Sequence, residues 1–359
     1  MVNGAKFMKN LSGTDLLAML TLLYCLLGSV FLFALGVNPI YLFRGFVFAL
    51  PQFVIKATAY VPGWVYLAVA AVILVFGKGR KISVAKLRSI IVAIIYCTLF
   101  TLMFGLVKNQ LPEVVPFWAD ALLAELDRTL HFGRNPWDLL SGLSAFNTNR
   151  LAAFYLNGWV FLATFLPVLL IAFDKNETRV RHFVGLWALA WVLLGNVVAL
   201  VFMSAGPIFA GLMPGVDPTA HAGVVELLAR PDAQALVRIR DYLWGSYSGT
   251  VSEIGSGISA FPSVHVGIAS VIGLYLLRLG QDAGAVIVTP LRRRAVLLGS
   301  AVAAFAVIGA YLVLSVYLGW HYAVDGYTSL LIISGSAWLL QRKRRRAPAA
   351  FAPAALAAE

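Results

Sequence analysis

The sequence predicts an all-α fold, a polytopic transmembrane helix bundle of about eight spans with both termini in the cytoplasm. Three observations lead to it. The 359 residues are 60% hydrophobic and 12% charged, with a mean hydropathy of +0.85, which is far from the composition of a soluble domain. The apolar residues form runs long enough to cross a bilayer. The cations cluster at the ends of these runs, which is typical of cytoplasmic loops.

The N-terminal segment 1–110 is predicted to hold the first helices. The run Leu16–Val37 lacks a clear small-residue cleavage site, so we expect a retained span rather than a signal peptide. The stretch 39–62 contains three prolines and two cations among aromatic residues. It is therefore predicted to be an interfacial or re-entrant segment.

The later apolar runs are predicted to be spans because their lengths fit a bilayer, with the two shortest extended by flanking residues. In chain order they are Trp64–Phe76, Ser89–Val107, Leu151–Phe173, Phe183–Met203, Val266–Leu277, Ala295–Leu318 and Tyr322–Leu340.

Charge predicts the orientation of these spans. If every basic loop faces the cytoplasm, the spans alternate without contradiction; the loops lie at residues 78–88, 175–181, 278–294 and 342–346. The net charge of +12 is thus assigned to membrane topology, and no nucleic-acid partner is expected. We expect a multi-pass protein of the cell inner membrane. The basic tail 342–359 is predicted to be disordered.

Two long segments, 108–150 and 204–263, then lie on the periplasmic, extracellular or lumenal face. Residues 118–130 have apolar side chains at helical spacing, which predicts a helix on the membrane surface, with a solvated connector as the alternative. The second segment is long enough to be a lid or substrate platform. Together with the last five spans they form a predicted catalytic membrane domain, 111–341.

The candidate site lies on this outer face. His321 and Asp325 are four residues apart, so a helix places them one turn from each other, where a carboxylate orients an imidazole. His265 begins another span and follows Pro262 and Ser263, a turn whose free amides suit an anion. Cys25 and Cys97 lie inside apolar runs and are expected to be free thiols. No cluster of ligands predicts a metal or another cofactor.

These residues carry a family resemblance. The segments FPSVH (Phe261–His265) and SVYLGWHYAVD (Ser315–Asp325) resemble the second and third signatures of the type-2 phosphatidic acid phosphatase superfamily. The His-Tyr-x-x-Asp form, preceded by Ser-x-Tyr-Leu, is most similar to the inositol phosphorylceramide synthase and sphingomyelin synthase branch. LDRTLHFGRNPW (Leu126–Trp137) and Gly206-Pro207 are similar to the former synthases. The likeness covers about Leu111 to Asp325 and implies a six-helix core with extra N-terminal helices.

The resemblance implies phosphoryl transfer in two steps without metal. His321 would be the nucleophile, Asp325 its orienting partner and His265 the acid that protonates the leaving alcohol. Substrate contacts are assigned to Ser263, Arg134, Gly206 and Tyr322. The sequence departs from the phosphatases in two places: Ser315 stands where they have an arginine, and their Lys-x6-Arg-Pro signature is missing. The other arginines available for phosphate on the outer segments are Arg128, Arg150, Arg230, Arg238 and Arg240.

Three functions are compatible with this pattern. The first is a lipid phosphotransferase that moves a phosphoinositol-like headgroup from a membrane phospholipid donor to a lipid-alcohol acceptor. The second is a lipid or polyprenyl-diphosphate phosphatase with the same catalytic set. The third is a proton-coupled transporter that uses the buried carboxylate and histidines as a relay, although no inverted repeat is evident.

Overall fold

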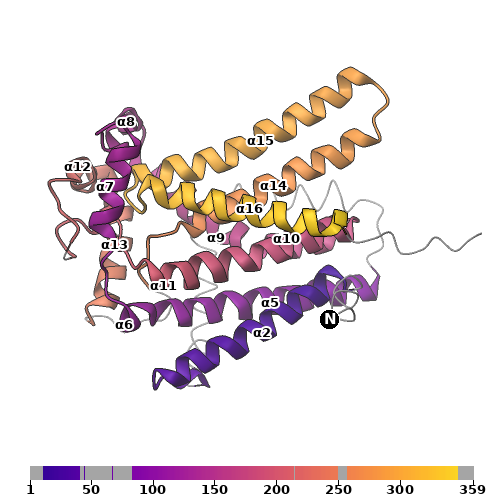
Figure 1. Cartoon of the computed structure of the whole chain (residues 1–359), viewed down its shortest axis with the longest axis horizontal. Helices are drawn as coiled ribbons and strands as arrows, with labels where there is room; N and C mark the ends of the chain where they lie inside the picture. The colour runs from indigo at the N-terminus through magenta and orange to yellow at the C-terminus, as the bar shows by residue number, and fades with distance from the viewer. Residues whose placement is uncertain are drawn as a thin grey trace, which may run out of the picture.

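The computed structural model describes residues 11–40, 83–213, 215–249 and 257–346, with the single positions 44 and 67. Every regular element in these residues is helical (Figure 1). Within this part of the chain, seven helices are long and apolar enough to cross a membrane. The predicted all-α polytopic bundle is confirmed, and the chain is a multi-pass membrane protein.

Each of the seven observed spans overlaps a predicted one. Six are single helices, and the fourth in chain order is composite, because a π-helical stretch interrupts it. They are α2 (Gly13–Ala34), α5 (Val84–Asn109), α9 (Thr148–Phe173), the composite α10 (Glu177–Leu189) with η2 (Ala190–Val198) and α11 (Ala199–Val201), then α14 (Val264–Ala285), α15 (Pro290–Tyr317) and α16 (Ala323–Arg346). Nearly all of the predicted span 64–76 and of the predicted interfacial segment 39–62 lies outside the described residues.

Local capping sets where the spans begin. Ser12 and Asp15 form a capping box at the start of α2, and the Ser83 hydroxyl accepts the Lys86 N–H at the start of α5. These side chains satisfy amides that have no partner in the first turn. The observed helices are longer than the predicted apolar runs because they begin at capping residues and continue through polar residues beyond the end of the run. At the C-terminus α16 runs on to Arg346, past the predicted domain boundary at 341, while residues 347–359 lie outside the described part.

Helices α2 and α5 run parallel. Near their middles the Thr21 hydroxyl donates to the Tyr96 carbonyl, and further along a Cβ added at Gly28 would lie 2.7 Å from the Met103 sulfur. Both contacts advance in the same direction along the two helices, so both helices end at the same side of the bundle (Figure 1). The predicted topology has one span between these two helices in the sequence. Two helices separated by a single crossing run parallel, as α2 and α5 do.

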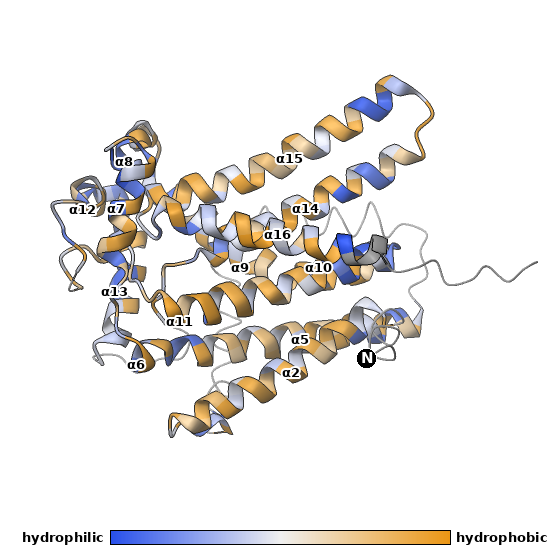
Figure 2. Cartoon of the chain, in the orientation of Figure 1, coloured by the Kyte–Doolittle hydropathy of each residue, from blue (hydrophilic) through white to orange (hydrophobic). Residues whose placement is uncertain are grey.

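The short elements gather at one end of the bundle, where α2, α5 and α9 also have a terminus (Figure 1). They come from the two segments predicted to face outward. They are α6 (Leu111–Val114), α7 (Asp120–Leu130), α8 (Pro136–Leu139), η1 (Ser141–Ala145), η3 (Pro207–Phe209), α12 (Ala222–Ala229), η4 (Pro231–Ala233) and α13 (Gln234–Tyr247). Hydrophilic residues concentrate there and at the opposite end, whereas the middles of the spans are hydrophobic (Figure 2).

Helix α7 is the predicted surface helix, and it is amphipathic in an unusual sense. Two of its three acidic residues, Asp120 and Asp127, are buried against the protein, whereas Glu125 is exposed. Its leucines Leu122, Leu126 and Leu130, at i, i+4 and i+8, are 45%, 39% and 53% exposed. The apolar stripe therefore faces away from the protein, as expected for a helix in contact with lipid.

At the opposite end a buried ionic cluster joins two spans. The Arg179 guanidinium on α10 lies 2.6 Å from Asp174 and also pairs with Asp282 on α14. The Tyr275 hydroxyl donates to Asp174 over 2.9 Å. Two carboxylates thus share one cation, which fixes the register of α10 against α14.

Candidate active site

The site is built around the connection between α15 and α16. Gly319 turns the chain there with φ of +76°, a conformation that a side chain disfavours. His321 follows, and its Nδ1 lies 3.2 Å from Oδ2 of Asp325, which also accepts the Tyr322 N–H over 3.1 Å. Asp325 is fully buried and His321 is only 6% exposed. The predicted one-turn spacing therefore produces an oriented imidazole.

His265 faces this pair from the first turn of α14. Its ring is stacked between Tyr155 and Trp159 of α9, with centroid distances of 4.5 and 4.1 Å. The His265 and His321 rings are 5.8 Å apart, edge to face. Ser263 caps α14 by accepting the Val266 N–H, and its own N–H donates to the Asp325 carbonyl. The two helix starts are thereby joined, and the structure brings His265, His321 and Asp325 together.

The segment 204–206 holds both histidine loops. Ser204 accepts the Ala260 N–H through its carbonyl and the Phe261 N–H through its hydroxyl. Gly206 has φ of +98°, and a Cβ there would lie 2.7 Å from the Trp320 carbonyl oxygen. The predicted contact residue Gly206 is thus packed against the loop that carries His321, where no side chain fits.

Two carboxylates that the sequence analysis did not assign to the site support it from α7. Asp127 accepts the N–H groups of Ala323 and Val324 over 2.7 and 2.8 Å, so its charge lies at the N-terminus of α16. Asp120 accepts the Gly206 N–H over 2.9 Å and the Tyr322 hydroxyl over 3.0 Å. Burial raises the pKa of both carboxyl groups, and these hydrogen bonds oppose that change.

The spacing of Asp120 and Asp127 in the sequence could have indicated that both contact backbone donors elsewhere in the protein. Seven residues separate them, so they share one side of a helix, and two carboxylates on that side are too costly to bury without donors.

Lys108, at the end of α5, is a partly buried cation whose charge acts on His321. Its Nζ donates to the Ser259 carbonyl over 3.4 Å. Burial, and then the Lys108 charge, lower the pKa of His321 to about 3, while the Ala260 carbonyl opposes this. The imidazole is therefore neutral at pH 7, the form that attacks phosphorus.

Sequence reasoning missed Lys108, but the spacing could have revealed it. Lys108 precedes Pro116 by eight residues, as in the Lys-x6-Arg-Pro signature, with Val115 in place of the arginine.

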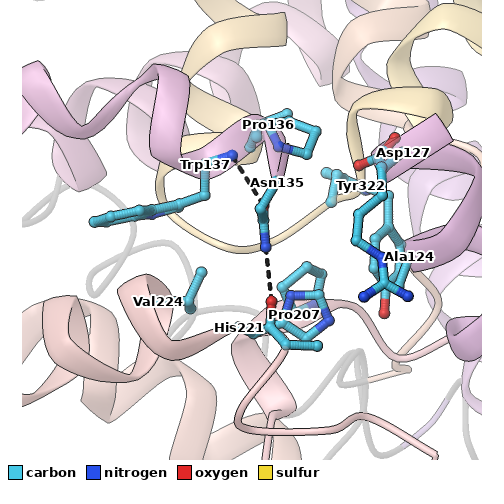
Figure 3. A pocket seen from close by; sticks show the side chains of 13 residues that line it. Ala124, Asp127, Asn135, Pro136, Trp137, Pro207, His221, Val224 and Tyr322 are labelled. Carbon is cyan, nitrogen blue, oxygen red and sulfur yellow. Dashed lines mark hydrogen bonds between the residues drawn. The ribbon is translucent and has the colours of Figure 1, made fainter. Parts of the chain in front are cut away.

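The residues considered as phosphate contacts differ in their exposure and in their partners. Arg134 is exposed in the turn between α7 and α8, whereas its neighbours Asn135 and Trp137 face a pocket beside His321 (Figure 3). Ser315 is buried, and its hydroxyl donates to Leu312. Of the other arginines, three pair with nearby carboxylates: Arg128 with Glu125, Arg230 with Asp232 and Arg240 with Asp241.

That pocket is enclosed by α7, α8 and α12 together with the His321 loop. Tyr322, predicted to contact substrate, forms part of its wall, as do His321 and Pro207. The described residues hold no group of three or more His, Cys, Asp or Glu side chains arranged for a metal ion.

The comparison with known proteins follows the same residues. A family model described as the PAP2 superfamily matches residues 121–339, more than half of the chain. The match includes His265, His321 and Asp325 and lies within the predicted catalytic segment 111–341. Searches among curated proteins and among solved structures found no significant match. With a bundle of membrane spans, paired histidines at one end and this match, the chain belongs to the PAP2 superfamily.

Proposed function

We propose that the protein is a lipid phosphotransferase that moves a phosphoinositol-like headgroup from a phospholipid donor to a lipid hydroxyl through a phosphohistidine. Membership of the superfamily makes it a phosphatase- or phosphotransferase-type lipid enzyme. The observation that carries the proposal is the buried His321–Asp325 pair facing His265 at 5.8 Å between ring centroids.

In the first step Nε2 of His321 attacks the donor phosphorus, because Nδ1 is directed at Asp325. The bond from phosphorus to the lipid oxygen breaks, and His265 gives its proton to that oxygen, which leaves as diacylglycerol. Asp325 stabilises the positive charge that develops on the imidazole. Tyr155 and Trp159 stack on His265 and hold its ring facing His321.

In the second step the acceptor hydroxyl gives its proton to His265, and its oxygen attacks phosphorus. The phosphorus–nitrogen bond breaks, His321 returns to its neutral state, and the headgroup phosphate is now joined to the acceptor lipid. Lys108 and the N-terminus of α14 supply positive charge for the phosphoryl oxygens in both steps. Ser263 adds a hydroxyl at that N-terminus, and the exposed Arg134 is available to lipid headgroups.

A lipid acceptor is favoured over water because of what surrounds His265. The aromatic rings of Tyr155 and Trp159 flank the ring closely, and His321 is 6% exposed. A lipid alcohol held by its chains presents its hydroxyl at this depth with a high effective concentration. A phosphatase acting on a lipid or polyprenyl diphosphate uses the same two steps with water as acceptor. The site is proposed to face the periplasmic, extracellular or lumenal side, opposite the basic loops.

The test is an assay of headgroup transfer in vesicles. Purified protein is mixed with phosphatidylinositol labelled in its headgroup, with or without a panel of lipid alcohols that includes a ceramide and a diacylglycerol whose acyl chains differ from those of the donor. We expect labelled phosphate to move to one of these acceptors faster than free inositol phosphate is released, and His321→Ala to do neither. Equal release with and without every acceptor would replace the transferase with the phosphatase.

A further inference from the structure

Two indoles near His265 lack the hydrogen bond that other tryptophans of this protein make. The nitrogens of Trp159 and Trp191 are buried, and neither has a hydrogen-bond partner among the residues that the structure describes. Three indoles elsewhere in that part of the chain donate to backbone carbonyls: Trp118 to Val201 over 3.3 Å, Trp137 to Tyr317 over 2.8 Å and Trp187 to Ala163 over 2.6 Å. Trp159 and Trp191 therefore keep a free donor each.

These two rings pack on each other beside the histidine. Trp159, on α9, stacks on the His265 ring with 4.1 Å between centroids, and the Trp191 ring lies 5.3 Å from that of Trp159. Trp191 is 4% exposed and belongs to the π-helical stretch η2, a conformation that is frequent at functional sites. Helix α9 and η2 thus bring both free donors to the same side of the active site.

A cation borders the same region. The Phe104 ring lies 4.5 Å from that of Trp191, and the Lys108 Nζ lies 5.6 Å from the centre of the Phe104 ring. The Lys108 charge acts on both catalytic histidines. Positive charge and free donors are therefore found together around the place where the proposed mechanism needs to hold a phosphoryl group.

The chemistry of the indole selects the kind of group that satisfies it. An indole nitrogen is a donor only, so a second donor in the ligand, such as an ammonium, gives it no partner. A buried donor without an acceptor costs free energy. Next to the Lys108 charge, the acceptor that fits is the oxygen of an anion, and a phosphoryl group presents several such oxygens.

The burial of these N–H groups matches that of the nucleophile. His321 is itself only 6% exposed, so a substrate enters by separating the side chains around the histidines. The groups that it then meets are those buried beside them. Because the His265 and His321 rings are 5.8 Å apart, a phosphoryl group between them lies next to the Trp159 ring that stacks on His265.

We propose that Trp159 and Trp191 are substrate-binding residues whose indole N–H groups donate to oxygens of the phosphoryl group at His321. The inference rests on the proposed function for the position of the phosphorus, and it applies whether the acceptor is a lipid alcohol or water. It adds two donors without charge to a site in which Lys108 supplies the charge.

The experiment measures the binding of orthovanadate, a tetrahedral oxyanion that resembles a phosphoryl group, to the purified full-length protein by calorimetry in one fixed detergent. Trp159→Phe and Trp191→Phe should each raise Kd about 10-fold, the loss of one hydrogen bond to a charged group. Phenylalanine keeps an aromatic ring for the stacking contacts and lacks the N–H. Trp118→Phe is the control, because that indole is 49% exposed and already donates to the Val201 carbonyl; its Kd should equal that of wild type.

A second replacement separates the donor from the shape of the ring. A benzothiophene analogue of tryptophan, incorporated at position 159 or 191, keeps the outline of the indole with sulfur in place of the N–H, and it should raise Kd as phenylalanine does. An unchanged Kd with the analogue overturns the assignment of that residue, even where the Phe variant binds more weakly. A wild-type protein that does not bind orthovanadate overturns it for both.

Failure of the transferase has a different readout. It appears as headgroup release that does not depend on an acceptor lipid, and it leaves the comparison of orthovanadate binding intact.

Discussion

Each histidine proposed to be catalytic is held in place by neighbouring side chains. His321 depends on Asp325, and His265 depends on the two aromatic rings of α9. Replacing a member of such a unit removes the function of the whole unit, so the effects of several replacements do not add.

His321→Ala and Asp325→Ala should each lower turnover by about 10²- to 10⁴-fold, because nucleophile and orienting carboxylate act together. The double variant should be little worse than His321→Ala alone. Turnover in vesicles measures this, and labelling of the protein by donor phosphate should vanish in His321→Ala. Ser329→Ala, a buried hydroxyl that donates to the Asp325 carbonyl, serves as the control. Activity near wild type in His321→Ala would contradict the assignment of the nucleophile.

The sequence was sufficient for the residues whose relation is local. His321 and Asp325 are one helical turn apart, and Ser263 and His265 lie in one capped turn, so spacing alone predicts their geometry. Lys108, Asp120 and Asp127 were not predicted, because their contacts join distant parts of the chain; the bond from Tyr322 to Asp120 spans 202 residues. The role of Arg134 stays a prediction.

At the scale of elements, α7 positions the start of α16. Through Asp127 it supplies the acceptors that the first turn of α16 lacks, and through Asp120 it holds Tyr322 and the loop at Gly206. By holding the start of α16 and the adjoining loop, helix α7 thus fixes the direction in which the His321 side chain points.

Asp127→Ala should lower kcat about 10-fold, because losing an acceptor at a helix N-terminus costs roughly 1–2 kcal/mol and loosens the His321 loop. KM for the donor should change little, since Asp127 has no free oxygen for substrate. Asp127→Asn keeps one acceptor oxygen, so its kcat should lie between those of wild type and Asp127→Ala. Steady-state kinetics with Thr129→Ala, exposed on the same helix, provide the comparison. A rise in KM without a change in kcat would show that Asp127 binds substrate instead.

For the whole molecule, hydropathy was enough to place the seven spans found among the described residues, because a bilayer imposes one length on every crossing. The helix ends depended on capping side chains such as Ser12 and Ser83, which extend helices beyond the apolar runs. The π-helical stretch η2 was not predicted, since its residues have the same apolar composition as the α-helix around it.

Arg179→Ala should destabilise the fold without altering the chemistry, because the ionic cluster lies at the end of the bundle opposite the histidines. It leaves Asp174 and Asp282 without their shared cation, and breaking a buried pair costs about 3–5 kcal/mol. Thermal unfolding in one fixed detergent should show a midpoint several degrees lower, with turnover at low temperature preserved. Arg292→Ala, at an exposed position, should leave the midpoint unchanged. An unaltered midpoint in Arg179→Ala would mean that the cluster does not hold α10 to α14.

Helix α7 also has a consequence for how the protein is handled outside a bilayer. This helix presents Leu122, Leu126 and Leu130 outward and the carboxylates that hold the His321 loop inward, so the surroundings of its outer face affect the geometry of His321. A micelle that leaves the exposed leucines in water disfavours the position in which α7 packs against the start of α16. A micelle that covers these leucines stabilises that position. The fraction of molecules with α7 packed in this position therefore differs between amphiphiles, and so do the measured rates. Variants are comparable only when the amphiphile is held constant.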